Sequence, residues 1–350
     1  MKKIFIFSVT MLLFFNYSFS QETQDSTLVV MEGQEDEIAY NEGLDLYKAQ
    51  DYQGAVAKFS EAINLNHDFA KAFLNRGRAK RHLKQYNESI IDLDSAIYKN
   101  DSLAIAFYIR GRVYGALDKD SLMIRDYMTA EEKGCKEANL FYFIGVQKFY
   151  NEDYESAISY FSKAIEQDPK HAFAYNDRGS AKRKTKDIKG AIQDYQKATS
   201  IDRKLAVAYD NLSVVKAIDK DTVGSIEASN RAIETKPDFY IAYNNRGSIY
   251  FFLRKYDEAI ADFNKAIEYK SDYAYAYNNL GNAKNKKEDY EGAVKALDKA
   301  IEIDPNYGAA YMNRAAAKEM LRDGKGACAD WNKAVELGIE QAKQFVGGCN

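Results

Sequence analysis

The sequence predicts an all-α solenoid built from repeated pairs of helices. Two observations lead to this prediction: small residues recur every 34 residues along most of the chain, and an alanine series with the same period accompanies them. The composition agrees, because 46% hydrophobic and 29% charged residues with only three prolines in 350 are typical of a folded, helix-rich chain. At this length, a repeat array or two domains is expected rather than one ordinary domain.

The first twenty residues predict a secretory signal peptide rather than part of the fold. Two lysines precede an apolar stretch over residues 4–15, and Ser18 and Ser20 are small residues typical of a cleavage site. We therefore expect cleavage between Ser20 and Gln21 and export to the periplasm or the medium of a bacterial cell. An uncleaved membrane anchor is the alternative, although the stretch is short for a span. No cysteine lies near the site, so no lipid anchor is expected.

The mature chain divides into a lead-in, a repeat array and a tail. Residues 21–35 are acidic and aperiodic, and are expected to form a flexible lead-in. Residues 342–350 are expected to hold the rest of a closing helix and the tail. The nine predicted repeats occupy residues 36–69, 70–103, 104–137, 138–171, 172–205, 206–239, 240–273, 274–307 and 308–341.

Two residue series define the repeat. The small series is Gly43, Gly77, Gly111, Gly145, Gly179, Ser213, Gly247, Gly281 and Ala315. The alanine series is Ala62, Ala96, Ala130, Ala164, Ala198, Ala232, Ala266, Ala300 and Ala334. Because small side chains let paired helices approach closely, we expect both series to lie between helices.

Each repeat is expected to form two helices joined by a turn. In the seventh repeat, a first helix begins near Ala242, a turn follows at Tyr256-Asp257, and a second helix has apolar residues at i, i+3, i+4 and i+7. Where proline occurs, it comes just after the second helix, which it can end. A single pair cannot bury its apolar face, so neighbouring pairs must stack.

These positions resemble the tetratricopeptide repeat over residues 36–341. The family pattern is matched in the seventh repeat by Tyr243, Gly247, Tyr250, Ala259, Phe263 and Ala266, and Pro305 closes the eighth repeat. The resemblance implies a right-handed superhelical solenoid that binds proteins. The sequence departs from the pattern in the third repeat, at Met123 and Gly134-Cys135, and in the sixth, at Ser213 and Ser229. The weakest stacking is expected there.

No constellation of catalytic residues is present in the sequence. It has no phosphate-binding loop and no nucleophile elbow, and none of its three histidines, His67, His82 and His171, is paired with a serine or cysteine at a telling spacing. We therefore expect neither an enzyme nor a cofactor or metal site. The net charge of −3 argues against a general nucleic-acid binder. Charged residues on the second helices are expected to form a solvated face.

The resemblance implies that repeat positions 2, 5, 9, 12 and 13 line a concave groove. Across the nine repeats these positions hold ten aromatic residues and eight Lys or Arg, against three acids. Aromatic and arginine enrichment is typical of protein-binding surfaces. The predicted groove residues are Lys71, Arg78, Arg81, Tyr108, Arg112, Tyr142, Phe149, Tyr150, Phe173, Arg183, Phe251, Phe252 and Tyr275.

A row of asparagines at position 6 is a second candidate for peptide binding. An amide side chain can pair with both the C=O and the N–H of an extended peptide. The alternative is that each amide bonds the backbone of its own repeat or is merely tolerated. Asp177 occupies the same row, whose asparagines are Asn41, Asn75, Asn211, Asn245, Asn279 and Asn313.

The C-terminal region predicts a disulfide between Cys328 and Cys349. Cys328 precedes Gly338 by ten residues and Cys349 follows it by eleven, so a chain reversal at Gly338 brings the two to similar heights. An apolar helical pattern after Gly338 suits a closing helix over the last repeat. The alternative is two free thiols, and Cys135 is expected to stay unpaired.

The sequence therefore predicts an exported, non-catalytic interaction scaffold. Its expected partner is a protein that presents an extended peptide or a helix, acidic or aromatic-rich, to the groove. One alternative is a structural or assembly subunit of an envelope complex that uses the edges or the convex face of the solenoid. Another is an accessory subunit that positions a catalytic partner. Self-association remains open.

Overall fold

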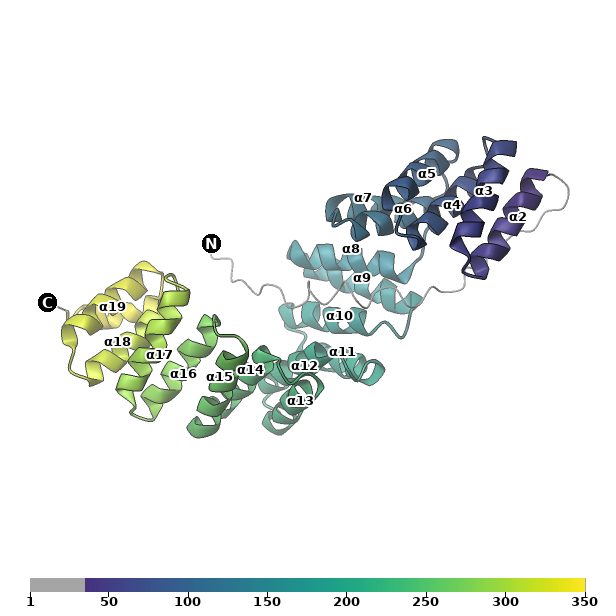
Figure 1. Cartoon of the computed structure of the whole chain (residues 1–350). Coiled ribbons are helices and arrows are strands. Elements are labelled where there is room, and N and C mark those ends of the chain that lie inside the picture. The colour runs from purple at the N-terminus through teal and green to yellow at the C-terminus, as the bar shows by residue number, and fades with distance from the viewer. Residues whose placement is uncertain (1–34, 350) are drawn as a thin grey trace. The chain divides into compact units, whose positions relative to one another are not determined.

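The computed structural model describes residues 35–349, all of whose elements are helices (Figure 1). The predicted signal peptide and its cleavage site, Ser20–Gln21, lie outside the described residues. The described part of the chain divides into two compact units, residues 35–135 and 136–349. The helices of the first unit are α2 (Glu35–Lys48), α3 (Tyr52–Leu65), α4 (Ala70–His82), α5 (Tyr86–Lys99), α6 (Ala104–Ala116) and α7 (Asp120–Glu132).

The second unit continues the same pairing of helices. Its pairs are α8 (Ala138–Tyr150) with α9 (Tyr154–Gln167), α10 (Ala172–Lys184) with α11 (Ile188–Ile201), α12 (Ala206–Ile218) with α13 (Thr222–Thr235), α14 (Tyr240–Phe252) with α15 (Tyr256–Tyr269), α16 (Ala274–Lys286) with α17 (Tyr290–Ile303), and α18 (Gly308–Met320) with α19 (Gly324–Glu336). Even-numbered helices up to α18 are called first helices and odd-numbered ones second helices.

Glycine in the small series makes room for an aromatic ring on the second helix. A Cβ on Gly247 would lie 2.8 Å from a ring carbon of Phe263, and one on Gly43 would lie 2.7 Å from the ring of Phe59. Both rings are buried. The prediction that small residues lie between the paired helices is therefore confirmed.

The sixth repeat replaces this ring-on-glycine contact with hydrogen bonds. The hydroxyl oxygens of Ser213 and Ser229 lie 2.5 Å apart, and the Ser225 hydroxyl donates to the Ser213 carbonyl at 2.7 Å. All three serines are fully buried. Ser229 is smaller than the aromatic residue it replaces, and this leaves room for the Ser213 side chain where other repeats have glycine. The two departures from the family pattern therefore compensate for each other in one contact.

The turn within each repeat lies earlier than predicted. In the seventh repeat the turn falls between Phe252 and Tyr256, not at Tyr256-Asp257, and the second helix starts at Tyr256. Arg254 adopts a left-handed conformation with φ of 61°, and the Lys255 amide donates to the Tyr250 carbonyl at 2.9 Å. These bonds satisfy the last carbonyls of the first helix. The other repeats have the same turn, again with a non-glycine residue at positive φ.

A glycine with positive φ ends the last helix pair of each compact unit. Gly134 has φ of 92° and follows α7, while Gly338 has φ of 82° and follows α19. In both places the next amide donates back to an alanine carbonyl, from Cys135 to Ala130 and from Ile339 to Ala334, each at 2.9 Å. The predicted departure at Gly134-Cys135 thus coincides with the boundary between the two units.

The closing segment is shorter than the predicted helix. It consists of a 3-10 turn (η1, Glu340–Ala342) and one helical turn (α20, Lys343–Val346). Ala342 is fully buried, and the Phe345 ring stacks on Trp331 with ring centroids 5.1 Å apart. The two glycines at 347 and 348 end the helix early because glycine is a poor helix former. This segment covers the last helix pair as expected for the end of a repeat array.

Candidate functional site

Four of the predicted groove and ladder residues are buried. Arg81 and Asn75 are each 8% exposed, and Tyr108 and Tyr142 are each 3% exposed. The Tyr108 and Tyr142 rings pack against Tyr127 and Phe161 of the second helices, so little of either ring is left for a partner. Position 5 of the repeat, occupied by both tyrosines, faces the interior where a large ring fills the space beside the second helix.

The asparagine row joins neighbouring repeats. Asn279 donates to the Asn244 side-chain oxygen at 2.9 Å, and Asn313 donates to that of Asn278 at the same distance. Asn211 and Asn245 donate to Asn176 and Asp210 in the same way, at 3.0–3.1 Å.

Each of these bonds links position 6 of one repeat to position 5 of the repeat before it. Asn75 in the first unit donates similarly to the Tyr40 hydroxyl at 2.7 Å. Neither predicted alternative included this arrangement. Asn41, in the first repeat, is half-buried. Peptide binding by the asparagine row stays a prediction. It would use the side-chain amide N–H and C=O groups that do not take part in these bonds between repeats.

Two aspartates, half-buried Asp177 and buried Asp210, take the place of asparagine in this ladder. Asp177 accepts from the Tyr142 hydroxyl at 2.8 Å and from the Asn176 amide at 2.9 Å. Burial raises the pKa of Asp177 to about 6, and it raises the pKa of Asp210 to the same value. Burial also raises the pKa of Tyr142 well above its ordinary value. The pKa values of both carboxyls therefore lie well above the ordinary value for aspartate.

The first unit holds arginines stacked on tyrosine rings. The Arg78 guanidinium lies 5.4 Å from the Tyr47 ring centroid, and the Arg112 guanidinium lies 5.8 Å from that of Tyr108. Arg78 also donates to the Asn75 side-chain oxygen at 3.3 Å. Arg78 and Arg112 are half-buried, and Lys71 is exposed. We call Arg78, Arg112 and their two tyrosines the arginine–tyrosine cluster.

The second unit holds most of the predicted aromatic residues. Phe149 packs edge-on against Tyr154 at 5.3 Å, and Phe251 packs against Tyr256 at 5.5 Å. Tyr275 is 41% exposed. The residues beside Phe149 and Phe251, namely Tyr150 and Phe252, are exposed, whereas Phe173 and Arg183 are half-buried.

Ion pairs between paired helices were not foreseen from the sequence. Arg246 of α14 donates to both carboxylate oxygens of Asp262 in α15, at 2.8 and 2.6 Å, and reaches the Asn230 side chain of the preceding repeat at 2.6 Å. Asp262 is only 5% exposed. The expectation that charges on second helices are solvated is therefore wrong at this position. The same pairing occurs at Arg76–Asp92, Arg110–Asp126, Arg178–Asp194 and Arg314–Asp330.

A signal for these pairs was present in the sequence. Arginine at position 7 and aspartate 16 residues later occur together in five repeats. In the sixth and eighth repeats both are replaced, by the buried pairs Leu212 with Ala228 and Leu280 with Ala296. Because the two residues are replaced together, the sequence indicates that position 7 and the position 16 residues later are in contact.

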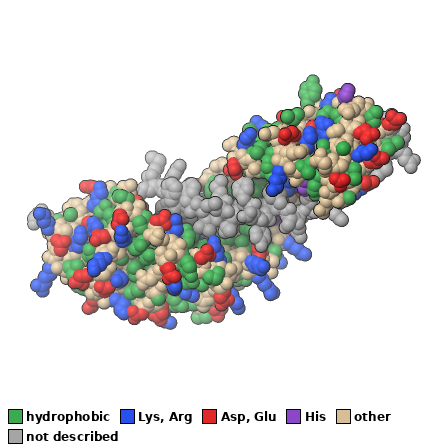
Figure 2. Space-filling model, in the orientation of Figure 1, with side chains coloured by type: hydrophobic (Ala, Val, Ile, Leu, Met, Phe, Trp, Pro, Cys, Tyr) green, Lys and Arg blue, Asp and Glu red, His purple; other side chains and the backbone are tan. Residues whose placement is uncertain are grey.

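The remaining surface mixes both signs of charge. In Figure 2 the Lys and Arg side chains are interspersed with Asp and Glu on the visible face. Within residues 35–349, no group of three or more His, Cys, Asp or Glu is placed to hold a metal ion. None of the helices in that range has the length and apolar character needed to cross a membrane.

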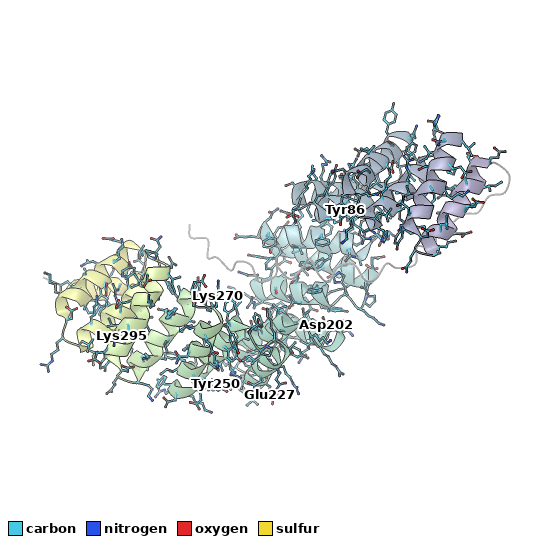
Figure 3. The ribbon with its side chains drawn as sticks, viewed as in Figure 1. Tyr86, Asp202, Glu227, Tyr250, Lys270 and Lys295 are labelled. Carbon is cyan, nitrogen blue, oxygen red and sulfur yellow. A yellow bond between two sulfur atoms is a disulfide. The ribbon has the colours of Figure 1, made fainter. Side chains whose placement is uncertain are left out.

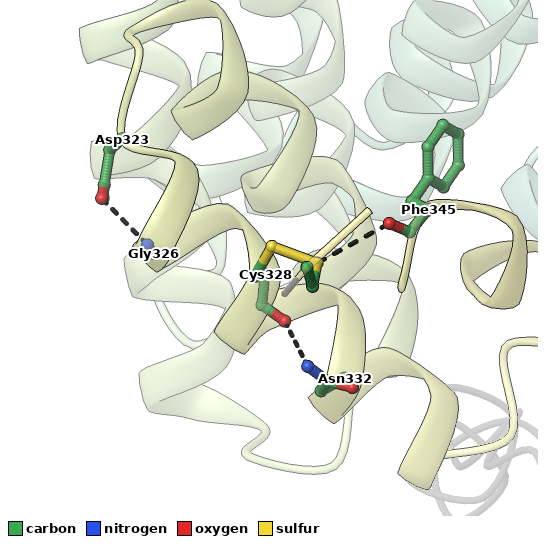
Figure 4. Close-up of a disulfide and its surroundings, with 6 residues drawn as sticks. Asp323, Gly326, Cys328, Asn332 and Phe345 are labelled. Carbon is green, nitrogen blue, oxygen red and sulfur yellow. Dashed lines mark hydrogen bonds between the residues drawn. A yellow bond between two sulfur atoms is a disulfide. The ribbon is translucent and has the colours of Figure 1, made fainter. Parts of the chain in front are cut away.

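Cys328 and Cys349 are joined by a disulfide, with Cα atoms 5.5 Å apart (Figure 4). The bond attaches the closing segment to α19. Around it, Asp323 caps α19 by accepting from the Gly326 amide at 2.9 Å. Cys135, in the first unit, is buried and takes no part in a disulfide.

The tetratricopeptide repeat family matches residues 40–105, 145–206, 240–273 and 274–307, which together make up more than half of the chain. The chain is a tetratricopeptide repeat protein. No curated protein matches its sequence. Such repeats are generally non-catalytic scaffolds for protein interactions, and the fold of this tetratricopeptide repeat protein supports that role.

Solved structures share the fold at low sequence identity. The Cut9–Hcn1 hetero-tetramer of the APC/C is similar over 93% of this chain and 78% of that chain, with a TM-score of 0.58 and 14% identity. Pseudomonas aeruginosa pilF covers 59% of this chain and 96% of its own, with a TM-score of 0.54 and 16% identity. YrrB, described as a TPR protein with an unusual peptide-binding site, is similar over 53% of this chain and 95% of its own chain, with a TM-score of 0.48 and 23% identity.

Proposed function

We propose that this tetratricopeptide repeat protein is an exported scaffold that binds an acidic, extended segment of a partner protein on the first helices of its first unit. The arginine–tyrosine cluster carries the proposal. Arg78 of α4 lies over the ring of Tyr47 in α2, and Arg112 of α6 lies over the ring of Tyr108 in the same helix. The two arginines are thus on consecutive first helices. A guanidinium can donate two parallel hydrogen bonds to a carboxylate, and a ring beneath it limits its motion.

The chemistry of the cluster favours a segment rather than a small ligand. Successive first helices present successive arginines, so carboxylates spaced along an extended chain can meet them in turn. Interfaces are enriched in arginine and tyrosine because both combine apolar area with hydrogen-bonding groups. Exposed Lys71 on α4 adds a further positive charge.

Export to the periplasm or the medium is the second part of the proposal. The predicted signal peptide supports it, and so does the disulfide between Cys328 and Cys349, because disulfides persist in oxidising compartments. Intact-mass measurement of the exported protein tests the cleavage. A chain that starts at Gln21 is expected, and one that retains Met1 would contradict the proposed processing.

Affinity purification of the exported protein, followed by mass spectrometry, tests the binding surface. Wild type is compared with the double variant Arg78→Glu, Arg112→Glu and with Lys84→Glu, an exposed control in the turn after α4. We expect the double variant alone to lose its partner. Capture should also weaken as salt rises, because charges at a partly exposed surface are screened over about 10 Å at 0.1 M salt.

Circular dichroism of the double variant keeps the result interpretable, since both arginines are half-buried. If the folded variant still captures the same partner, the cluster is not the binding surface. That outcome would favour an assembly subunit that uses another face, or an accessory subunit of an enzyme.

A further inference from the structure

The second helix α5 exposes large apolar side chains on its outward side. It belongs to the first unit and begins at Tyr86 (Figure 3). Ile91 is 64% exposed, and the ring of Tyr98, seven residues later, is 89% exposed. Four residues follow one another at i, i+3, i+7 and i+10 and therefore lie on one side of the helix. We call them the α5 face: Glu88, Ile91, Ser95 and Tyr98.

The fold does not require apolar residues at these positions. In α13, α15, α17 and α19 the residues equivalent to Ser95 and Tyr98 are a Lys or Arg and a Glu, which form ion pairs of 2.5–2.9 Å. The residue equivalent to Ile91 is Glu227 in α13 and Lys295 in α17. These repeats form the same helix pairs, so packing within a repeat does not explain the two exposed apolar side chains. Apolar side chains grouped on an exposed surface indicate an interaction site more strongly than isolated ones do.

The charge around the α5 face is negative. Outside the five groove positions of each repeat, residues 35–135 hold sixteen Asp or Glu and only nine Lys or Arg. On α5 itself, Glu88 is exposed, whereas Lys99 is held in an ion pair at 2.8 Å. Asp94, beside the face, is half exposed and already pairs with Arg110 at 2.7 Å. The charge that the α5 face offers to a partner is therefore that of a carboxylate.

We infer that the α5 face binds an amphipathic helix of a partner protein that carries Lys or Arg beside its apolar stripe. This surface lies on a second helix, not on the first helices that hold the groove positions, and it goes beyond the proposed function.

The shape of the α5 face suits a helix. Glu88 and Tyr98 are ten residues apart, or about 15 Å along α5, which matches about three turns of a partner helix. Ser95 is small, so a partner side chain can enter between Ile91 and Tyr98. A partner Lys or Arg can pair with Glu88, and another can lie over the Tyr98 ring. An extended segment would gain less, because the backbone groups of α5 are already bonded within the helix.

Charge distinguishes a cationic helix from the other candidate occupants. An anionic membrane or a nucleic acid would meet the acidic surface with like charge. A second copy of this chain would place its own Glu88 and Asp94 against those of the first. Residues 21–34, which precede α2, carry three acids and no Lys or Arg. A basic amphipathic helix is therefore the occupant that the charge favours.

The test uses the full-length protein and a fluorescent synthetic peptide of about 18 residues, or five helical turns. The peptide has leucine at i, i+3 and i+7 spacing, lysine on both sides of this stripe and alanine elsewhere, so that it forms an amphipathic helix. Binding is measured by fluorescence anisotropy. We expect saturable binding to wild type that weakens about tenfold for the double variant Ile91→Ser, Tyr98→Ser and about fivefold for Glu88→Lys.

Matched controls use exposed residues of α13, a second helix of the second unit. Val223→Ser removes an apolar side chain that is 70% exposed, and Glu227→Lys makes the same charge reversal as Glu88→Lys (Figure 3). Neither should change the affinity, and Arg78→Glu, Arg112→Glu should not weaken it. Since the α5 residues substituted are exposed, their variants should keep the wild-type thermal midpoint.

Equal affinity of the Ile91→Ser, Tyr98→Ser variant and the wild type for the peptide would overturn the inference. So would equal binding of a peptide with glutamate in place of each lysine. Sedimentation velocity should show no self-association through α5; a wild-type dimer that Tyr98→Ser converts to a monomer would mean that a second copy covers the face. Because the α5 variants leave Arg78 and Arg112 intact, a failure here leaves the proposed function standing.

Discussion

The Asn245 side-chain amide donates to both carboxylate oxygens of Asp210, 35 residues earlier, at 3.0 and 3.1 Å. This contact joins the sixth and seventh repeats through side chains alone. At the equivalent places in later repeats, Asn244 and Asn278 accept from an amide in the same way. An asparagine could therefore replace Asp210 with its hydrogen bond kept.

Asp210→Asn should stabilise the protein at neutral pH. Because burial raises the pKa of Asp210 to about 6, above its ordinary value of 3.8, the ionised carboxylate disfavours the folded state. The wild type should thus lose stability as the pH rises from about 4 to 7. Relative to the wild type, the variant should have a free energy of unfolding about 1–3 kcal/mol higher above pH 7 and little different at pH 4. Urea unfolding across this pH range measures the difference. Asp238→Asn, at an exposed link, should show no such effect.

Replacing Arg246 with leucine should destabilise the protein by about 3 kcal/mol. The single change leaves the carboxylate of Asp262 buried without its guanidinium partner. The double variant Arg246→Leu, Asp262→Ala copies the buried Leu280 with Ala296 of the next repeat, so it should recover most of the loss. A double-mutant cycle by urea unfolding tests this, and additive losses would show that the pair is not coupled.

Lys220→Gly should stabilise the second unit by about 0.5–1 kcal/mol. Lys220 has φ of 68°, a left-handed conformation that costs energy for residues with a Cβ but not for glycine. The same substitution at exposed Lys197, in the middle of α11, should instead cost about 1 kcal/mol, since glycine is a poor helix former. Thermal unfolding compares the two variants. Equal destabilisation of both would contradict the assigned turn.

The unreduced, denatured protein should contain one free thiol, that of Cys135. Three free thiols on counting would refute the disulfide between Cys328 and Cys349. Reduction should also change the fluorescence of Trp331, the single tryptophan of the chain, because the Phe345 ring is then released from its stack. The 21-residue separation predicts a stabilisation of about 3 kcal/mol in the loop-entropy account.

The repeat architecture could be predicted because it depends on the size of the side chains at a few fixed positions of each repeat. Gly247 and Phe263 are recognisable in the sequence because a Cβ at position 247 would lie only 2.8 Å from the ring. The ladder from Asn245 to Asp210 could not be predicted in this way. An asparagine at position 6 is equally compatible with a solvated amide, and its partner lies in another repeat. Likewise, the burial of Tyr142 depends on the angle between helices, which the 34-residue period does not specify.

Hydrogen–deuterium exchange on the purified complex with the captured partner tests most directly whether the first helices of the first unit bind it. Binding should protect amides near the C-terminal halves of α4 and α6, which carry Arg78 and Arg112, and leave α5 and α7 unchanged. The salt that weakens capture should remove this protection. Protection confined to the second helices α5 and α7, with α4 and α6 unchanged, would contradict the account.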